Sequence, residues 1–144
     1  MADSRYRHEV ERFVREAFLA TRLGKCFEAK AVRLSDGGLF NCDAVSDDGT
    51  ILASICTNAG KTSSGRNATP KLMKVRSDIL FMLRAPAARR LIVTTCDDMH
   101  ALCEQQRRIG RMPCEIEFHL ADIEVEMRLR LRQEHTVGAA EMGR

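Results

Sequence analysis

Three side chains near the middle of the chain have types and a spacing that could serve chemistry. Asp43 lies in the stretch FNCDAVS, and Ser54 and Cys56 lie in the stretch ILASICT that follows it. The pair Asp48-Gly49 between the two stretches favours a two-residue turn that joins antiparallel strands. Such a turn places Asp43 directly opposite Ser54, so that the two side chains share one face of the hairpin. The sequence therefore predicts a lone carboxylate that faces a hydroxyl, with a thiol one step further along.

The same register assigns the rest of the hairpin to two faces. It pairs Asn41 with Cys56 and Val45 with Leu52, on the face that holds the candidate site. The opposite face is apolar and suited to packing on a helix; its expected members are Phe40, Cys42, Ala44, Ile51, Ala53, Ile55 and Thr57.

Charged residues outside the hairpin could complete the site. Residues 27–34, FEAKAVRL, predict a preceding strand. A two-residue turn between this strand and the hairpin would place Lys30 opposite Asp43, whereas a three-residue turn would put Lys30 on the other face. Glu9 and Glu28 are further candidate carboxylates. For all three residues, ion pairing at the surface is the alternative role.

The remaining elements follow from hydrophobic periodicity and from turn residues. Residues 123–132, IEVEMRLRLR, alternate as a strand would, although an amphipathic helix is also compatible with them. The pattern predicts, in order, a helix at 4–23, strands at 27–34, 40–46 and 51–57, a helix at 69–84, a strand at 90–95, a helix at 97–109, and strands at 114–120 and 123–132. This order predicts an α/β domain with a mixed sheet and helices on its faces.

Composition limits the class of protein. A chain of 144 residues with 44% hydrophobic and 30% charged residues is typical of one globular domain, expected at 1–134 with a tail at 135–144. The six cysteines include no C-x-x-C pair, which disfavours a zinc site. The charged start of the chain and the absence of a long apolar run predict no signal peptide, no membrane partner and a cytoplasmic location.

The order helix, three-strand meander, helix, strand resembles the core of the PD-(D/E)xK, or restriction-endonuclease-like, nuclease superfamily. The resemblance covers roughly residues 4–120. In that family an Asp on the second strand and a Glu/Asp-x-Lys on the third strand share one face and hold Mg²⁺. On this resemblance Asp43 matches the metal-binding Asp, Ser54 takes the acidic position and Cys56 takes the lysine position.

The departures from the family pattern concern its chemistry. A serine hydroxyl is a poor replacement for a carboxylate on Mg²⁺, and a thiol has no positive charge to offer a phosphate. The resemblance therefore implies a nuclease-like domain that has lost catalysis. The alternative is an active nuclease, dependent on Mg²⁺ or Mn²⁺, whose missing groups come from elsewhere in the fold, with Lys30 and Glu9 as candidates and Asp43 as the metal ligand.

Residues 60–90 hold eight basic residues against a single acid, Asp78, although the whole chain has a net charge of only +3. So dense a basic segment indicates a polyanionic partner, and a solvated helix face is the alternative. In the resembled family this loop and helix lie beside the active face. We therefore expect nucleic acid, DNA in the first place, to bind at four residues: Lys61, Arg66, Lys71 and Lys74.

A third hypothesis concerns association with a protein partner. The strand expected at 123–132 carries an apolar stripe that could be an uncovered sheet edge. A homodimer joined through this strand is therefore the alternative to nucleic-acid binding.

Overall fold

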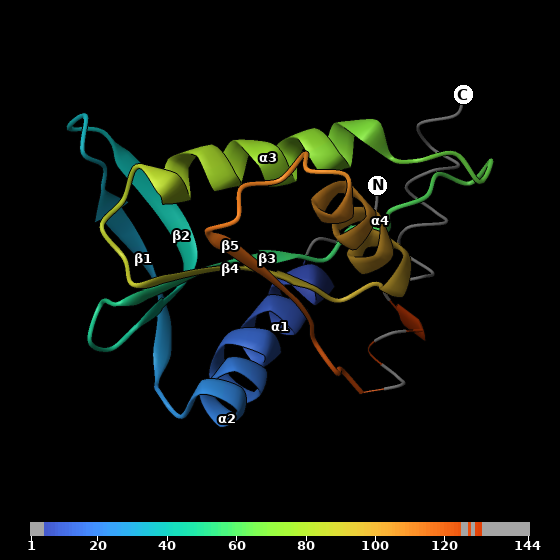
Figure 1. Cartoon of the computed structure of the whole chain (residues 1–144). Coiled ribbons are helices and arrows are strands. Elements are labelled where there is room, and N and C mark those ends of the chain that lie inside the picture. The colour runs from blue at the N-terminus through green and yellow to red at the C-terminus, as the bar shows by residue number, and fades with distance from the viewer. Residues whose placement is uncertain (1–4, 125–126, 128, 131–144) are drawn as a thin grey trace.

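The computed structural model describes residues 5–124, 127, 129 and 130. A five-stranded mixed sheet in the order β1-β2-β3-β4-β5 forms its centre (Figure 1). The first three strands make an antiparallel meander, and the last three run parallel to one another. The strands are β1 (Phe27–Arg33), β2 (Leu39–Ser46), β3 (Ile51–Cys56), β4 (Arg89–Thr94) and β5 (Ile116–Leu120). The expected α/β class with a mixed sheet is confirmed.

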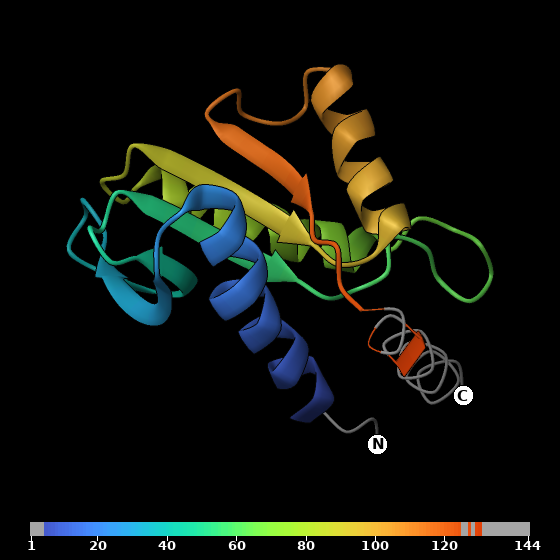
Figure 2. The same ribbon diagram turned by 90° about the horizontal axis from the view of Figure 1, so that it is seen from below.

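Helices cover both faces of the sheet (Figures 1 and 2). On one face α1 (Arg5–Phe13), the π-helical turn η1 (Val14–Phe18) and α2 (Leu19–Leu23) follow one another without a break until Gly24. The other face holds α3 (Thr69–Leu83), which connects β3 to β4, and α4 (Asp97–Arg108), which connects β4 to β5. The two connections join parallel neighbours, as helical crossovers do.

Two hydrophobic clusters attach these helices to the sheet. The cluster under α3 and α4 includes Phe40, Cys42, Val45, Leu52, Leu72, Val75, Ile79, Met82, Ile92, Met99 and Leu102. The cluster under α1, η1 and α2 includes Val10, Val14, Leu19, Phe27, Ala44, Ile51, Ala53, Ile55, Leu91 and Val93. β4 contributes to both clusters, which explains its nearly continuous apolar sequence.

The predicted assignment of the hairpin to two faces is wrong at Phe40 and Cys42. Both residues pack under α3 together with Val45, whereas Ala44 packs under α1. The cause is a break of register between β1 and β2. Glu28 pairs with Val45 and Lys30 pairs with Cys42, so two β2 residues oppose one β1 residue. Such a bulge reverses the alternation of side chains along the strand that carries the extra residue.

The register between β2 and β3 agrees with the sequence prediction where the strands are paired. Val45 lies opposite Leu52 and Ala44 lies opposite Ala53. β2 ends at Ser46 and β3 begins at Ile51, so four residues separate them in place of the two expected. The register is nevertheless kept, because the longer loop is still centred on Asp48-Gly49.

The strand expected at 123–132 is wrong at the positions that the structure describes beyond residue 124. Residues 127, 129 and 130 are helical, as the alternative interpretation had it, and residues 125, 126, 128 and 131–132 lie outside the described part of the chain, as does the expected tail at 135–144. At the described positions this segment therefore provides no edge strand through which a second chain could pair. No helix among the described residues has the length and hydropathy needed to span a bilayer.

Gly60 fixes the loop between β3 and α3 against α4. Its N–H donates a hydrogen bond of 2.9 Å to the Asp98 carboxylate in the first turn of α4. A Cβ at Gly60 would lie 2.6 Å from the Asp98 carbonyl oxygen and 2.7 Å from the Cα of Met99. Because both are backbone atoms, a side chain at residue 60 would force the loop away from α4.

We therefore expect Gly60→Ala to lower the free energy of unfolding by about 1–3 kcal/mol, the usual cost of overpacking. Gly38→Ala is the matched control, because a Cβ there would meet only the Leu34 side chain at 3.9 Å. Urea denaturation of both variants provides the measurement. Equal stability of the two variants would contradict the close contact at Gly60.

Candidate functional site

Asp43 lies at the point where β2 separates from β3. The pairing between the two strands stops at Ala44. Beyond it the Asp43 carboxylate, in place of a backbone carbonyl of β2, accepts a hydrogen bond from β3. Its Oδ2 accepts the backbone N–H of the buried Ile55 at 2.8 Å. Burial raises the pKa of Asp43, and the nearby charge of Asp78 raises it further. The carboxylate is thus a half-buried structural acceptor in the sheet itself.

Ser54 connects Asp43 to a second carboxylate that sequence reasoning missed. The Ser54 hydroxyl donates to Asp78 Oδ2 on α3 at 2.8 Å, and it lies 3.5 Å from Asp43 Oδ2. A hydroxyl has one proton to donate, so Asp78 is its partner and Asp43 is only a neighbour. The second Asp78 oxygen accepts the Lys74 ammonium at 2.5 Å. Asp43, Ser54, Asp78 and Lys74 form what we call the polar network.

The helix on the opposite face also approaches Asp43. Arg15, in the wide π-helical turn, donates to the Asp43 backbone carbonyl at 3.1 Å. The half-buried Glu11 lies one turn earlier, and burial, followed by the charge of Asp43, raises the pKa of Glu11. The helix therefore does approach the site with a carboxylate, but through Glu11 and not through the expected Glu9.

Cys56 lies one step along β3 from Ser54 and close to α3. Burial raises the pKa of this thiol, and hydrogen bonds with Asn58 and the nearby charge of Lys71 lower it by less, so that the net shift is upward. Burial also raises the pKa of Cys42 to about 11 and that of Cys103 to about 12. These thiols stay protonated near neutral pH, which disfavours a nucleophilic role.

The residues of the polar network do not fit a Mg²⁺ or Mn²⁺ ion in the arrangement described. Both Asp78 oxygens are engaged, by Ser54 and by Lys74, and one Asp43 oxygen is engaged by the Ile55 amide. Among the described residues, no three side chains of His, Cys, Asp or Glu lie together in a way that could hold a metal ion. A metal would have to displace the Lys74 ammonium first.

The expected additions to the site lie elsewhere. Lys30 pairs with Cys42 instead of Asp43, because the register between β1 and β2 is offset by one residue from that of a two-residue turn. Its side chain is exposed, as are those of Glu9 and Glu28. The sequence did contain a signal for Asp78, since it is the single acid of the basic segment and lies between the apolar positions Val75 and Ile79 of the helix.

Several basic residues of the segment are engaged in local contacts. Arg84 forms a two-bond ion pair with Asp36, and Arg89 forms one with Glu117. Arg76 donates to the uncharged Gln106 amide, and Arg90 donates to the Met82 carbonyl in the last turn of α3 and to the Ala85 carbonyl just after it. Among the described residues, five cations of the segment form no ion pair with a carboxylate, and three of them lie in the loop before α3 and in its first turn: Lys61, Arg66 and Lys71.

These three cations form what we call the cationic surface, at the loop before α3 and on its first turn. Lys61 and Asn67 form an isolated antiparallel backbone bridge, and the Thr62 N–H donates to the Arg66 carbonyl at 2.7 Å. The loop is therefore a tight hairpin of its own. Lys61 and Arg66 are exposed on it, and Lys71 is half-buried beside Cys56. The hairpin projects beyond the end of the sheet (Figure 1). The cationic surface therefore borders the polar network.

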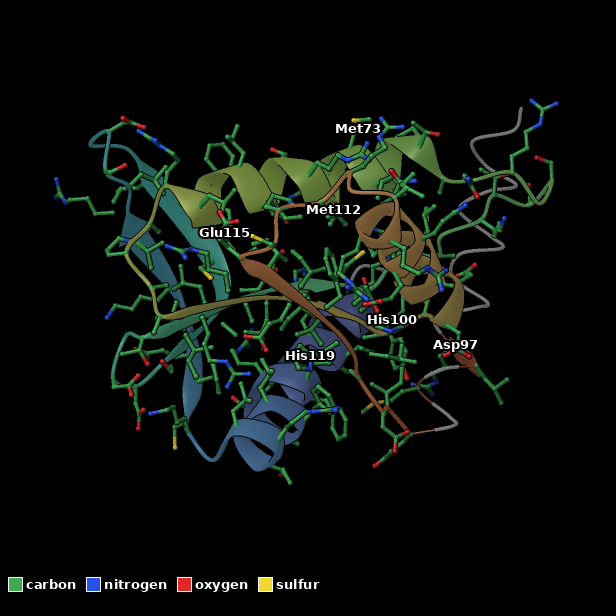
Figure 3. The ribbon with its side chains drawn as sticks, viewed as in Figure 1. Met73, Asp97, His100, Met112, Glu115 and His119 are labelled. Carbon is green, nitrogen blue, oxygen red and sulfur yellow. The ribbon has the colours of Figure 1, made fainter. Side chains whose placement is uncertain are left out.

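Two of the described histidines lie on elements outside the polar network, and the third, His8 on α1, lies 3.6 Å from Glu11. Figure 3 shows His100 on α4 and His119 on β5, two strands away from β3. His119 Nε2 lies 3.2 Å from Glu117 Oε1, beside the Arg89 ion pair.

Comparison with known proteins gives no further guidance. No protein-family model matches the chain, no curated protein matches it, and no solved structure matches it.

Asp43 can be tested through the acceptor that it provides. We expect Asp43→Ala to lower the free energy of unfolding by about 1–3 kcal/mol, because the buried Ile55 N–H is left without an acceptor. Asp43→Asn keeps an oxygen at this place and should cost less. Denaturant titration of both variants at neutral pH provides the measurement, and an equal cost in the two variants would contradict the role of the carboxylate oxygen.

The stability difference between wild type and Asp43→Asn should depend on pH with a definite sign. The pKa of Asp43 is raised above 3.8 in the folded chain, so the folded state holds the Asp43 proton more tightly than the unfolded state does. The contribution of Asp43 to stability therefore falls as the pH rises from 3.8 through the folded pKa. The difference in unfolding free energy between Asp43→Asn and wild type should move in favour of the variant over that range. A difference that is constant with pH, or that moves the other way, would overturn this assignment.

Proposed function

We propose that the chain is a nuclease-like domain that binds nucleic acid through its cationic surface and does not cleave it. The observation that carries the proposal is the cationic surface itself: Lys61, Arg66 and Lys71 lie in one loop and the helical turn that follows it, and none of them forms an ion pair with a carboxylate of the described residues. Lys and Arg side chains of this kind bind phosphate groups and release counterions from nucleic acid. Duplex DNA is the ligand we favour.

The arrangement of elements supports a nuclease-like fold. The order α-β-β-β-α-β places Asp43 on the second strand and Ser54 and Cys56 on the third, as the resemblance to the PD-(D/E)xK superfamily implies. A shared fold does not by itself determine function, so the residues of the site carry the proposal.

The composition of the site supports binding without cleavage. The positions of the family acid and lysine hold Ser54 and Cys56, and the acid that α3 brings to Ser54 is already bound by Lys74. The chain has no tryptophan and a single tyrosine, Tyr6, which lies on α1. Binding is therefore expected to use the phosphate backbone, without stacking of bases on aromatic rings.

We expect the chain to bind a short DNA duplex with an affinity that falls steeply with salt. Replacing Lys61 and Arg66 by Gln should weaken binding at low salt and reduce the slope of log K against log [salt] by about 1.8, since each lost phosphate contact contributes about 0.9. Fluorescence anisotropy over a series of salt concentrations provides the measurement.

The matched control replaces two exposed basic residues of β1, Lys30 and Arg33, by Gln. This variant loses the same charge from a strand at the far edge of the sheet, and its slope should stay within about 0.5 of the wild-type slope, because only cations that contact phosphate contribute their full 0.9. Equal losses in the two double variants would mean that only net charge matters. No binding by wild type at low salt would end the proposal.

A second candidate function is cleavage by relocated groups. One observation favours it: α3 brings a carboxylate, Asp78, and two ammonium groups, Lys71 and Lys74, close to Ser54 and Cys56 on β3. This candidate requires Lys74 to release Asp78, so that the two carboxylates become available together.

Incubation of supercoiled plasmid with Mg²⁺ or Mn²⁺ separates the two candidates. Our proposal predicts that the plasmid remains intact with wild type, because the carboxylates are engaged within the chain. Nicking that disappears in both Asp43→Ala and Asp78→Asn, while Glu9→Gln still nicks, would establish the second candidate and contradict the first.

A further inference from the structure

Lys74 has an unusual position relative to the cationic surface. It lies on α3 one turn after Lys71, and 67% of its side-chain surface is exposed. Its ammonium nevertheless contacts Asp78, whose side chain is only 12% exposed. A flexible, exposed lysine that could extend the cationic surface is thus bound to an acid at the edge of the core.

Asp78 is well placed to keep this contact. Its other oxygen accepts the Ser54 hydroxyl at 2.8 Å, and the buried neighbours Val75 and Ile79 fix the helix on the sheet. Lys74 and Asp78 are four positions apart on one helix, so the carboxylate and the ammonium are neighbours on its surface. A phosphate group that took the ammonium would leave a nearly buried carboxylate without its cation, which is costly.

We propose that Asp78 withholds Lys74 from the cationic surface, so that the contact limits the affinity of the chain for polyanions. This inference rests on the proposed nucleic-acid binding. Asp78 and a phosphate group compete for one ammonium, and Asp78 has the advantage of proximity. Removal of the Asp78 charge frees Lys74 to make an additional phosphate contact.

Four proteins test the inference: wild type, Lys74→Gln, Asp78→Asn and the double variant. Asn at residue 78 keeps an oxygen for Ser54 and loses the charge. We expect Asp78→Asn to bind a DNA duplex more tightly than wild type, with a slope of log K against log [salt] that is steeper by about 0.9. Between 50 and 200 mM salt this slope corresponds to an extra loss of about 3.5-fold in affinity.

The double variant separates a specific contact from a general effect of charge. If Asp78 withholds Lys74, Lys74→Gln costs less than twofold in wild type and removes the whole gain in the Asp78→Asn background. A gain that persists in the double variant, or an Asp78→Asn protein that melts as wild type does and binds no better, overturns the inference.

A measurement on wild type keeps the test independent of the folding of these variants. The rates of acetylation by acetic anhydride are followed at single lysines by mass spectrometry. Lys74 should react several times more slowly than the exposed Lys61 and Lys30, because its nitrogen is engaged in the ion pair with Asp78. Equal rates overturn the inference. Absence of DNA binding by wild type would instead refute the proposed function. The acetylation rates test the contact between Lys74 and Asp78 independently of DNA binding.

Discussion

The hydrogen bond from the Ile55 amide to the Asp43 carboxylate is the interaction on which the site depends. In a regular antiparallel pair a backbone carbonyl would accept this N–H, but the bulge in β2 takes the backbone away from β3 at Asp43. A side-chain oxygen restores the acceptor at 2.8 Å. Because a buried amide without an acceptor is costly, the carboxylate must stay in the sheet, although burial raises its pKa. The parting of the two strands thus fixes an acid beside Ser54.

The helix α3 then determines what surrounds this acid. Its apolar side packs on the sheet, and Lys71, Lys74 and Asp78 follow one another at helical spacing along the side that approaches β3. Asp78 reaches Ser54 while Lys74 compensates Asp78. The loop before the helix is held against α4 at Gly60, so that Lys61 and Arg66 lie at a defined end of the sheet. The Asp78 carboxylate is therefore held at the edge of the core with Lys74 as its cation, while Lys61 and Arg66 remain exposed at the end of the sheet.

Local patterns were enough to predict much of the fold. The order of elements and the opposition of Val45 and Leu52 follow from turn residues and alternation, which act over short distances along the chain. The faces of Phe40 and Cys42 were wrong, since the bulge depends on how β1 pairs with β2. The same offset removed Lys30 from the site.

The missing members of the site come from contacts that no local pattern encodes. Asp78 meets Ser54 across 24 positions of sequence, and Arg15 meets Asp43 across 28. The charge of the basic segment was read correctly from composition, but its distribution was not, because the partners Asp36 and Glu117 come from other elements. A polar residue at an apolar position of a helix, such as Asp78, is the signal that a buried partner exists.

The central claim is that phosphate groups dock on the loop before α3 and on the first turns of that helix. Titration of the ¹⁵N-labelled chain with a short DNA duplex, followed by amide chemical shifts, tests it most directly. The account predicts that the largest shifts fall within residues 60–75 and that the amides of β1 are unaffected. Shifts centred on β1 or on the last turn of α4, or none at millimolar duplex in low salt, would contradict it.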